Sequence, residues 1–481
     1  MSRALSRRDL LRGAATCGLG LAGLSAPALL GCGRRRDLRR VHLRVEPASG
    51  LPPDGLGILL ADHLEALGGL TVLPWPAPGH PLPARSRATL LRLTPRLEAR
   101  GLAFDVEVSY PSGLRRPGIS LPPAEPLEAF TRLAATLPFQ LAPVSGEALC
   151  PAGGQGLSAL LEALADEDDP RRGPERLAFS RALARAHPGC ATARLLYANQ
   201  LYNQLLLHPL EQDVQWGAFQ AYRAGLASVP DHPRGVSGFS QLLADSGLHR
   251  DGLSLLEAAL GRHPAVPSLY RALAYLARTA GLLDLALRAL GELGRLTDGQ
   301  PRSHCENAYL YAGEAEAHRA TCRLEGTGRD TRVHFYLGYL ALAAGDRDAA
   351  RAAFAAARAV PGGWYGFEGL ATVLALALEG GWPEALARLK ALADQRSALR
   401  APDGEFTFKL AEAAAFLGQT DQALELGELA FTQGFGCTRW YERSPFLAPV
   451  RGTARWQVLH GHLQERQSLL ESRYPPRRFG L

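Results

Sequence analysis

The sequence predicts a small α/β domain at the amino-terminal end, followed by an all-α superhelix of short repeats, an α-solenoid. Apolar and polar residues alternate in several stretches of residues 41–148, as they do in half-buried strands. Glycines recur at intervals close to 34 residues within residues 233–433, between segments whose apolar residues have helical spacing. The expected parts are a leader over 1–31, a basic tether over 32–40, the α/β domain over 41–148, the helical array over 150–433 and a carboxy-terminal cap over 434–481.

Composition and charge exclude several classes of function. Of the 481 residues, 47% are hydrophobic and 21% charged, so the chain can bury a core and is not of the disordered class. Its net charge is +6, but the first 40 residues alone carry +7, from nine Arg against Asp9 and Asp37, which leaves −1 for residues 41–481. No broad basic face remains for a nucleic acid. The only lysines are Lys390 and Lys409, and neither lies in a P-loop or an S-x-x-K motif. This excludes P-loop nucleotide chemistry and serine acyl transfer of the penicillin-binding type.

The leader resembles a twin-arginine signal that ends in a bacterial lipobox. Arg7 and Arg8 precede a mildly apolar stretch, and Leu-Leu-Gly31 stands directly before Cys32. The resemblance implies cleavage after Gly31, acylation of Cys32, and a lipid anchor on the periplasmic side of the cell envelope. Gly33 after the cysteine favours the outer membrane. An ordinary cleaved signal with a chance cysteine is the alternative.

Residues 41–148 predict one strand–helix–strand unit and a hairpin. The predicted elements are a strand at 41–45, a helix at 54–67, a strand at 70–73, a hairpin of 88–97 with 102–110, a strand at 119–121 and a helix at 126–141. The helix at 55–64, the strand at 69–73 and the hairpin end at 110–113 resemble the TolB-like domain, also seen in FlgO-like envelope proteins. That resemblance implies a binding or assembly module. A generic small α/β sandwich is the alternative.

The helical array has a repeated turn frame. Around the turn at Gly345, a Leu-Gly pair ending at Gly338 comes before, and Ala350, Phe354 and Ala357 come after. This pattern resembles the tetratricopeptide (TPR) repeat. Equivalent turn glycines are expected at Gly247, Gly281, Gly380 and Gly418, with one degenerate repeat over 302–328 and irregular hairpins at 156–189 and 191–230. Aromatic residues of the cap, Trp440, Phe446 and Trp456 among them, are expected to seal the end of the stack.

The TPR resemblance also implies a partner-binding groove on the concave face. Arg271 and Arg278 flank Tyr275 on one helix, a basic and aromatic patch that suits an acidic or carboxylate-bearing partner. An ordinary solvated helix face is the alternative. The residues of this predicted groove are Arg234, Gln241, Arg271, Tyr275, Arg278, Arg332, Phe335, Tyr339, Phe408 and Glu412.

The remaining cysteines and histidines predict no catalytic site. His318 and Cys322 share a helix face, but their spacing with His304 and Cys305 matches no closed zinc pattern. Buried thiols, or a disulfide between Cys305 and Cys322, are the expected states. No catalytic motif, metal site or cofactor site is expected.

The sequence therefore favours a noncatalytic envelope lipoprotein that binds or scaffolds protein partners through TPR repeats. A regulatory or sensory adaptor is the first alternative, because the same two kinds of domain accompany bacterial regulators. A metal-dependent periplasmic enzyme that uses His318 is the weaker alternative.

Overall fold

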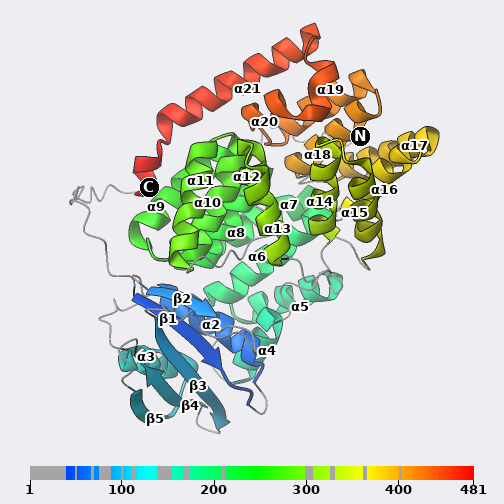
Figure 1. The fold of residues 1–481 in the computed structure, drawn as a ribbon. Coiled ribbons are helices and arrows are strands. Elements are labelled where there is room, and N and C mark those ends of the chain that lie inside the picture. The colour runs from blue at the N-terminus through cyan, green and yellow to red at the C-terminus, as the bar shows by residue number, and fades with distance from the viewer. Residues whose placement is uncertain are drawn as a thin grey trace. The chain divides into compact units, whose positions relative to one another are not determined.

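The computed structural model confirms a small α/β part followed by helices (Figure 1). It describes residues 39–48, 51–66, 70–74, 88–98, 101–110, 115–137, 154–165, 173–207, 212–297, 307–325, 331–360, 366–399 and 403–481. The signal and lipidation residues Arg7, Arg8, Gly31 and Cys32 lie outside these ranges. No helix of the described ranges is both long and apolar enough to span a membrane.

The α/β part contains a five-stranded mixed sheet in the order β2-β1-β3-β4-β5. Its strands are β1 (Arg39–Val45), β2 (Leu70–Pro74), β3 (Thr89–Glu98), β4 (Gly101–Ser109) and β5 (Arg115–Ala124). β1 is parallel to β2 and β3, whereas the β3–β4 and β4–β5 pairs are antiparallel. Glu98 pairs with Gly101 at the hairpin turn, and Gly101 has a φ of 120°, which favours glycine. The predicted unit and hairpin are present, and β5 is longer than expected.

The two faces of this sheet have different coverings. α2 (Pro53–Ala66) and α3 (Pro126–Thr136) contribute to the apolar core on one face, where the Phe130 ring lies 6.3 Å from that of Phe104. The other face carries ion pairs such as Arg96–Asp105, at 2.8 Å. α3 ends five residues before the predicted helix end, because Leu137 precedes a proline and is extended, with a ψ of 149°.

Antiparallel helix pairs make up most of the remaining chain. They are formed by α4 (Gly154–Ala165), α5 (Gly173–Ala186), α6 (Ala191–Leu207), α7 (Gln212–Ser228), α8 (Pro233–Asp245), α9 (His249–Arg262), α10 (Pro267–Ala280), α11 (Leu283–Leu296), α12 (Asn307–Ala312), α13 (Ala315–Glu325), α14 (Thr331–Ala343), α15 (Arg347–Ala359), α16 (Phe367–Leu378), α17 (Trp382–Ser397), α18 (Gly404–Phe416) and α19 (Thr420–Thr432). From α8 onward, each helix with an even number packs on the helix that follows it.

The turns of these pairs depend on glycine. All five predicted turn glycines have a φ between 72° and 90°, a left-handed conformation that other residues rarely adopt. A sixth, Gly313, has a φ of 89° and joins α12 to α13, where the sequence predicted only a degenerate repeat. Each turn therefore reverses the chain within a few residues, which lets the two helices lie side by side.

Small residues bring the paired helices close together. A Cβ added at Gly338 of α14 would lie only 2.7 Å from ring atoms of Phe354 in α15. Ala350, Phe354 and Ala357 are all fully buried, as the repeat frame predicts. Only glycine at 338 leaves room for the phenylalanine ring at this distance.

The sheet and the helices share contacts that bury polar groups. α4 packs on α2, and its Leu157 and Leu161 belong to the apolar core of the sheet. The buried hydroxyl of Thr71 in β2 donates a hydrogen bond to the carbonyl oxygen of Ala265, at 2.6 Å. The helices expected from residue 150 onward thus begin inside the core of the α/β part, and residues 38–481 form one unit.

The carboxy-terminal segment returns to the middle of the helical array. It consists of α20 (Thr438–Arg443), a 3-10 helix (Pro445–Val450), the long helix α21 (Ala454–Arg473) and a second 3-10 helix (Pro476–Phe479). The amide of Gly436 donates to the carbonyl of Thr279 in α10, at 2.7 Å, and Arg478 pairs with Glu257 in α9, at 2.8 Å. α21 spans the distance between these two contacts (Figure 1). The chain end therefore binds α9 and α10, more than 150 residues earlier.

Candidate functional site

The structure distributes the ten residues of the predicted groove over α8, α10, α14 and α18. Phe335, Tyr339, Phe408 and Glu412 are each at most 2% exposed, so they belong to the interior and cannot line an open groove. That part of the expectation is corrected. The reason is that the carboxy-terminal segment contacts Tyr339, Phe408 and Glu412. Phe335 packs on Phe354 of α15 and Phe367 of α16.

Arg234 has a different role from the predicted one. Its Nε donates to Oδ2 of Asp62 in α2 at 2.6 Å, and both side chains are largely buried. Arg234 thus joins α8 to the α/β part. Gln241, Arg271 and Arg332 are half-buried.

A set of ionisable and amide side chains lies in the interior between the helices, and we call it the inner polar cluster. It consists of Asp245, Arg278, Asn307, Glu405, Lys409 and Glu412. Apart from Arg278, which is only slightly exposed, all of them are buried.

Arg278 has an internal carboxylate partner. Its Nη2 donates to Oε2 of Glu405 in α18 at 2.8 Å, and its guanidinium lies 4.7 Å from the centre of the Tyr275 ring. The sequence predicted that this patch binds a carboxylate of a partner protein. The carboxylate in the structure comes from the same chain, 127 residues later.

Glu405 is held as a charged carboxylate despite its burial. Burial alone raises a carboxyl pKa, but the Arg278 charge, together with hydrogen bonds from Tyr311 and Asn307, gives Glu405 a lowered pKa. Nδ2 of Asn307 donates to Oε1 of Glu405 at 2.6 Å. The nearby Asp403, at the start of α18, has a raised pKa because it is buried and close to the Glu405 charge.

Asp245 is the carboxyl group of the cluster whose pKa is raised. Burial, and secondarily the charge of Asp403, raise its pKa to about 7. The hydroxyl of Tyr275 donates to Oδ1 of Asp245 at 2.6 Å, and the hydroxyl of Tyr202 donates to Oδ2. Three helices, α6, α8 and α10, thus meet at this one carboxyl group.

Lys409 lies in an aromatic cage. Its Nζ is 4.2 Å from the centre of the Tyr339 ring and between 5.4 and 5.9 Å from those of Tyr311, Tyr336, Phe408 and Trp440. Ring faces attract a cation, so the cage offsets part of the cost of removing this ammonium from water.

The carboxylate of Glu412 completes the site of Lys409. Oε2 of Glu412 accepts from the ammonium at 2.8 Å. Oε1 accepts from the hydroxyl of Tyr339 at 2.7 Å, from Nε1 of Trp440 at 3.1 Å and from the hydroxyl of Ser444 at 2.5 Å. Both oxygens are therefore used, and the pair links α14, α18 and α20.

His318 and Cys322, the residues considered for a metal site, form part of the packing. His318 is fully buried, its Nε2 lies 3.1 Å from Oδ1 of Asn307, and its Nδ1 lies 3.7 Å from the sulfur of Cys322. Among the described residues, no group of three potential ligands is arranged to hold a metal ion. The predicted disulfide stays a prediction, because Cys305 lies outside the described residues.

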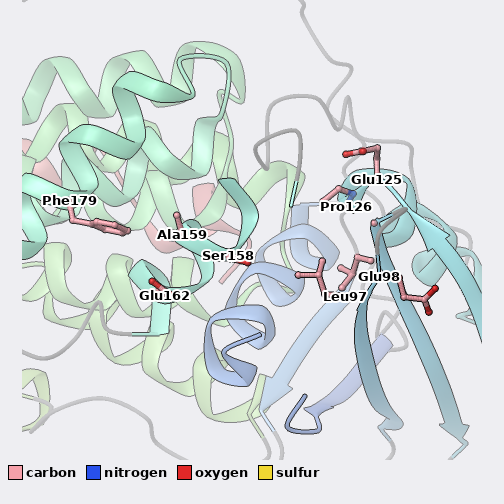
Figure 2. A pocket seen from close by; sticks show the side chains of 10 residues that line it. Leu97, Glu98, Glu125, Pro126, Ser158, Ala159, Glu162 and Phe179 are labelled. Atoms are coloured by element: carbon pink, nitrogen blue, oxygen red, sulfur yellow. The ribbon is translucent and has the colours of Figure 1, made fainter. Parts of the chain in front are cut away.

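An open cavity of about 590 Å³ lies where the β3–β4 hairpin approaches α4 and α5 (Figure 2). We call it the acidic pocket, and define it by Leu97, Glu98, Glu125, Glu162 and Phe179. The hairpin and the start of α3 supply Leu97, Glu98 and Glu125, whereas α4 and α5 supply Glu162 and Phe179. Sequence reasoning missed this site, because its residues come from four elements that no local pattern connects.

The sequence did contain a signal for the inner polar cluster. Glu405, Lys409 and Glu412 are spaced i, i+4 and i+7 on a helix that is otherwise apolar, which places three charges on one face. One of the only two lysines in the chain is among them. Three charges on one face of an apolar helix indicate buried ion pairs as readily as they indicate a binding face.

Comparison with known proteins identifies no relative. No protein-family model matches the chain, and no curated protein matches it.

Proposed function

We propose that this protein is a noncatalytic lipoprotein of the bacterial cell envelope, anchored through Cys32, that binds or scaffolds protein partners with TPR-type helical repeats. In this proposal the amino-terminal part is a TolB-like docking or assembly module. We propose that the lipid anchor lies in the periplasmic leaflet of the outer membrane, because Gly33 follows Cys32.

The observation that carries the proposal is the constant phase of the helix pairs. Each predicted turn contains a glycine in the left-handed backbone conformation. In every one of these helix pairs, the residue five positions after that glycine is buried. For Gly281, Gly380 and Gly418 these residues are Ala286, Ala385 and Ala423. Repeats in constant phase stack into an extended and rigid surface, which is the architecture that scaffold proteins use.

The position of the binding surface differs from the one first expected. The inner faces of α10, α14 and α18 are occupied by the inner polar cluster and by α20, so a partner has to bind elsewhere on the array or on the α/β part. An acidic peptide would have to displace Glu405 from Arg278, and we therefore do not expect it to bind there.

The anchor is tested by feeding cells an alkyne-tagged fatty acid and measuring its incorporation into the full-length chain. We expect incorporation in the wild type, none in Cys32→Ser, and retention in the cytoplasm for an Arg7→Lys, Arg8→Lys variant. Equal labelling of the wild type and Cys32→Ser would refute anchoring at this cysteine.

The scaffold role is tested by purifying the tagged full-length protein from detergent-solubilised membranes and identifying what co-purifies with it. We expect reproducible enrichment of a small set of envelope proteins, and its loss in the Arg7→Lys, Arg8→Lys variant, which does not reach them. Enrichment that is identical for both forms would mean that the captured proteins are contaminants.

A further inference from the structure

The acidic pocket exposes apolar side chains that a folded protein normally covers. Leu97 is 40% exposed and Phe179 is 43% exposed, and both line this one cavity. Figure 2 shows Leu97 on the sheet side and Phe179 on the helix side. Leu102 and Pro126, which are both buried, also line the cavity. Apolar residues gathered at a hollow, unlike single exposed ones, mark an interaction site.

Among the described residues, every charged residue that lines this cavity is acidic. Glu98, Glu125 and Glu162 are exposed, and the part of the lining that the structure describes contains no lysine or arginine. Nε of Arg96 lies 3.6 Å from Glu98, but this arginine also donates to Asp105 at 2.8 Å on the open sheet face. Three carboxylates around an apolar floor repel nucleic acids and anionic head groups, and they attract cations.

We infer that the acidic pocket binds a short basic amphipathic segment of a partner protein, with one or two apolar side chains inserted between Leu97 and Phe179 and flanking Lys or Arg residues paired with Glu98, Glu125 and Glu162. A cavity of about 590 Å³ has the size of sites that hold small ligands or peptide anchors. This inference deepens the proposed scaffold function, on which it rests, because it names one binding surface and the chemistry of its partner.

The basic tether of the same molecule is too short to fill the pocket. Thr89 pairs with Val41, near the start of β1, and β3 then runs nine residues further to Glu98. At about 3.3 Å per residue, the pocket lies about 30 Å from that point. The seven residues from Cys32 to residue 38 span at most about 25 Å. The tether is therefore not the occupant, and the acidic lining favours a basic segment of a partner protein.

The test measures the binding of fluorescent twelve-residue peptides to the purified full-length protein by anisotropy. The first peptide alternates Lys or Arg with Leu or Phe at helical spacing, the second has Glu in place of its basic residues, and the third has Ser in place of its apolar residues. We expect the first to bind at least about tenfold more tightly than either of the others, because both charge and apolar contact contribute.

Two sets of variants locate the binding. The triple variant Glu98→Gln, Glu125→Gln, Glu162→Gln is expected to weaken binding of the first peptide by about tenfold and to reduce its salt dependence. The matched control Glu368→Gln, Glu379→Gln, Glu384→Gln removes three exposed acids on α16 and α17 and their connection, and is expected to leave binding unchanged. Phe179→Ala, which changes a side chain that is already 43% exposed, is expected to weaken binding by at least about fivefold.

Several outcomes would overturn the inference. These are binding of no peptide, equal binding of the acidic peptide, an equal loss in the control triple variant, or full binding by Phe179→Ala. Tighter binding of a peptide made of residues 33–38 would instead make the pocket a contact between copies of this chain. If no peptide binds but envelope proteins still co-purify, only the inference about the acidic pocket is wrong. If the first peptide binds specifically but no protein co-purifies, only the scaffold role is wrong.

Discussion

The inner polar cluster and the acidic pocket both concentrate charge, but they differ in burial and in the signs of their charges. In the cluster, Arg278 faces Glu405 and Lys409 faces Glu412, each pair at 2.8 Å. In the pocket, three glutamates share one cavity with exposed apolar side chains. Paired charges that are shielded from water have no capacity left for a ligand, whereas exposed charges of one sign retain it.

This difference shows that a charged face is not evidence for binding until its partners are known. Arg278 and Tyr275 have the composition of a carboxylate-binding patch, and they do bind a carboxylate, but it belongs to α18. The prediction of an external carboxylate at Arg278 is therefore corrected, because the carboxylate that Arg278 binds is internal.

The largest effect is expected from Lys409→Met, which leaves the Glu412 carboxylate buried without its cation. Breaking a buried ion pair from one side costs about 3 to 5 kcal/mol of unfolding free energy. Lys390→Met is the matched control, because Lys390 is exposed and pairs only with Asp394 on the surface, so we expect a change below about 0.5 kcal/mol. Urea unfolding followed by circular dichroism measures both, and equal losses would show that burial does not distinguish the two lysines.

Arg278→Met tests the second buried pair. We expect a loss of about 2 to 4 kcal/mol, somewhat less than for Lys409, since Asn307 and Tyr311 still donate to Glu405. The control is Arg288→Met, whose partner Asp284 lies one turn away on the exposed face of α11. A double-mutant cycle with Glu405→Gln isolates the pairwise energy, and a coupling near zero would contradict the assignment of Glu405 as the partner.

Asp245→Asn tests the one carboxyl of the cluster whose pKa is raised. The folded chain keeps its proton up to about pH 7, whereas the unfolded chain releases it near pH 4. Between these values the unfolded state binds fewer protons, so the unfolding free energy falls as the pH rises. We expect the variant to lack this decline and to be more stable than the wild type at pH 8 by on the order of 2 kcal/mol. Identical pH profiles of the two proteins would contradict it.

The smallest effect on stability is expected in the acidic pocket. The triple change of Glu98, Glu125 and Glu162 to Gln removes exposed charges of one sign, so the unfolding free energy should change by less than about 0.5 kcal/mol, if anything upward. The same variant is expected to lose peptide binding. A large loss of stability would mean that these glutamates serve the fold, and the contrast between the two regions would disappear.

Local features of this fold were predictable, because they depend on neighbouring residues. The five turn glycines were found from spacing alone, since a left-handed φ requires glycine wherever the turn occurs. The hairpin of β3 and β4 was predicted from the alternation of apolar and polar residues on both sides of a short turn. Gly313 was missed, because the helix before it, α12, is only six residues long and leaves little periodicity to detect.

Nonlocal features were not predictable in this way. Nothing near Arg278 in the sequence indicates Glu405, and nothing near Thr279 indicates Gly436, which lies 157 residues later. The TPR resemblance assigned Phe335, Tyr339, Phe408 and Glu412 to the concave face of the array. The burial of Tyr339, Phe408 and Glu412 follows from contacts with the carboxy-terminal segment, which repeat periodicity does not describe, whereas Phe335 packs on Phe354 and Phe367 of the array.

The burial of Lys409 allows unfolding of this chain to be followed by the chemical reactivity of its lysines. Lys390 is well exposed, whereas the side chain of Lys409 is 1% exposed. An amine-reactive reagent should therefore modify the native protein at one lysine and the unfolded protein at two. Counting modified lysines by peptide mapping would then follow unfolding without any label engineered into the protein.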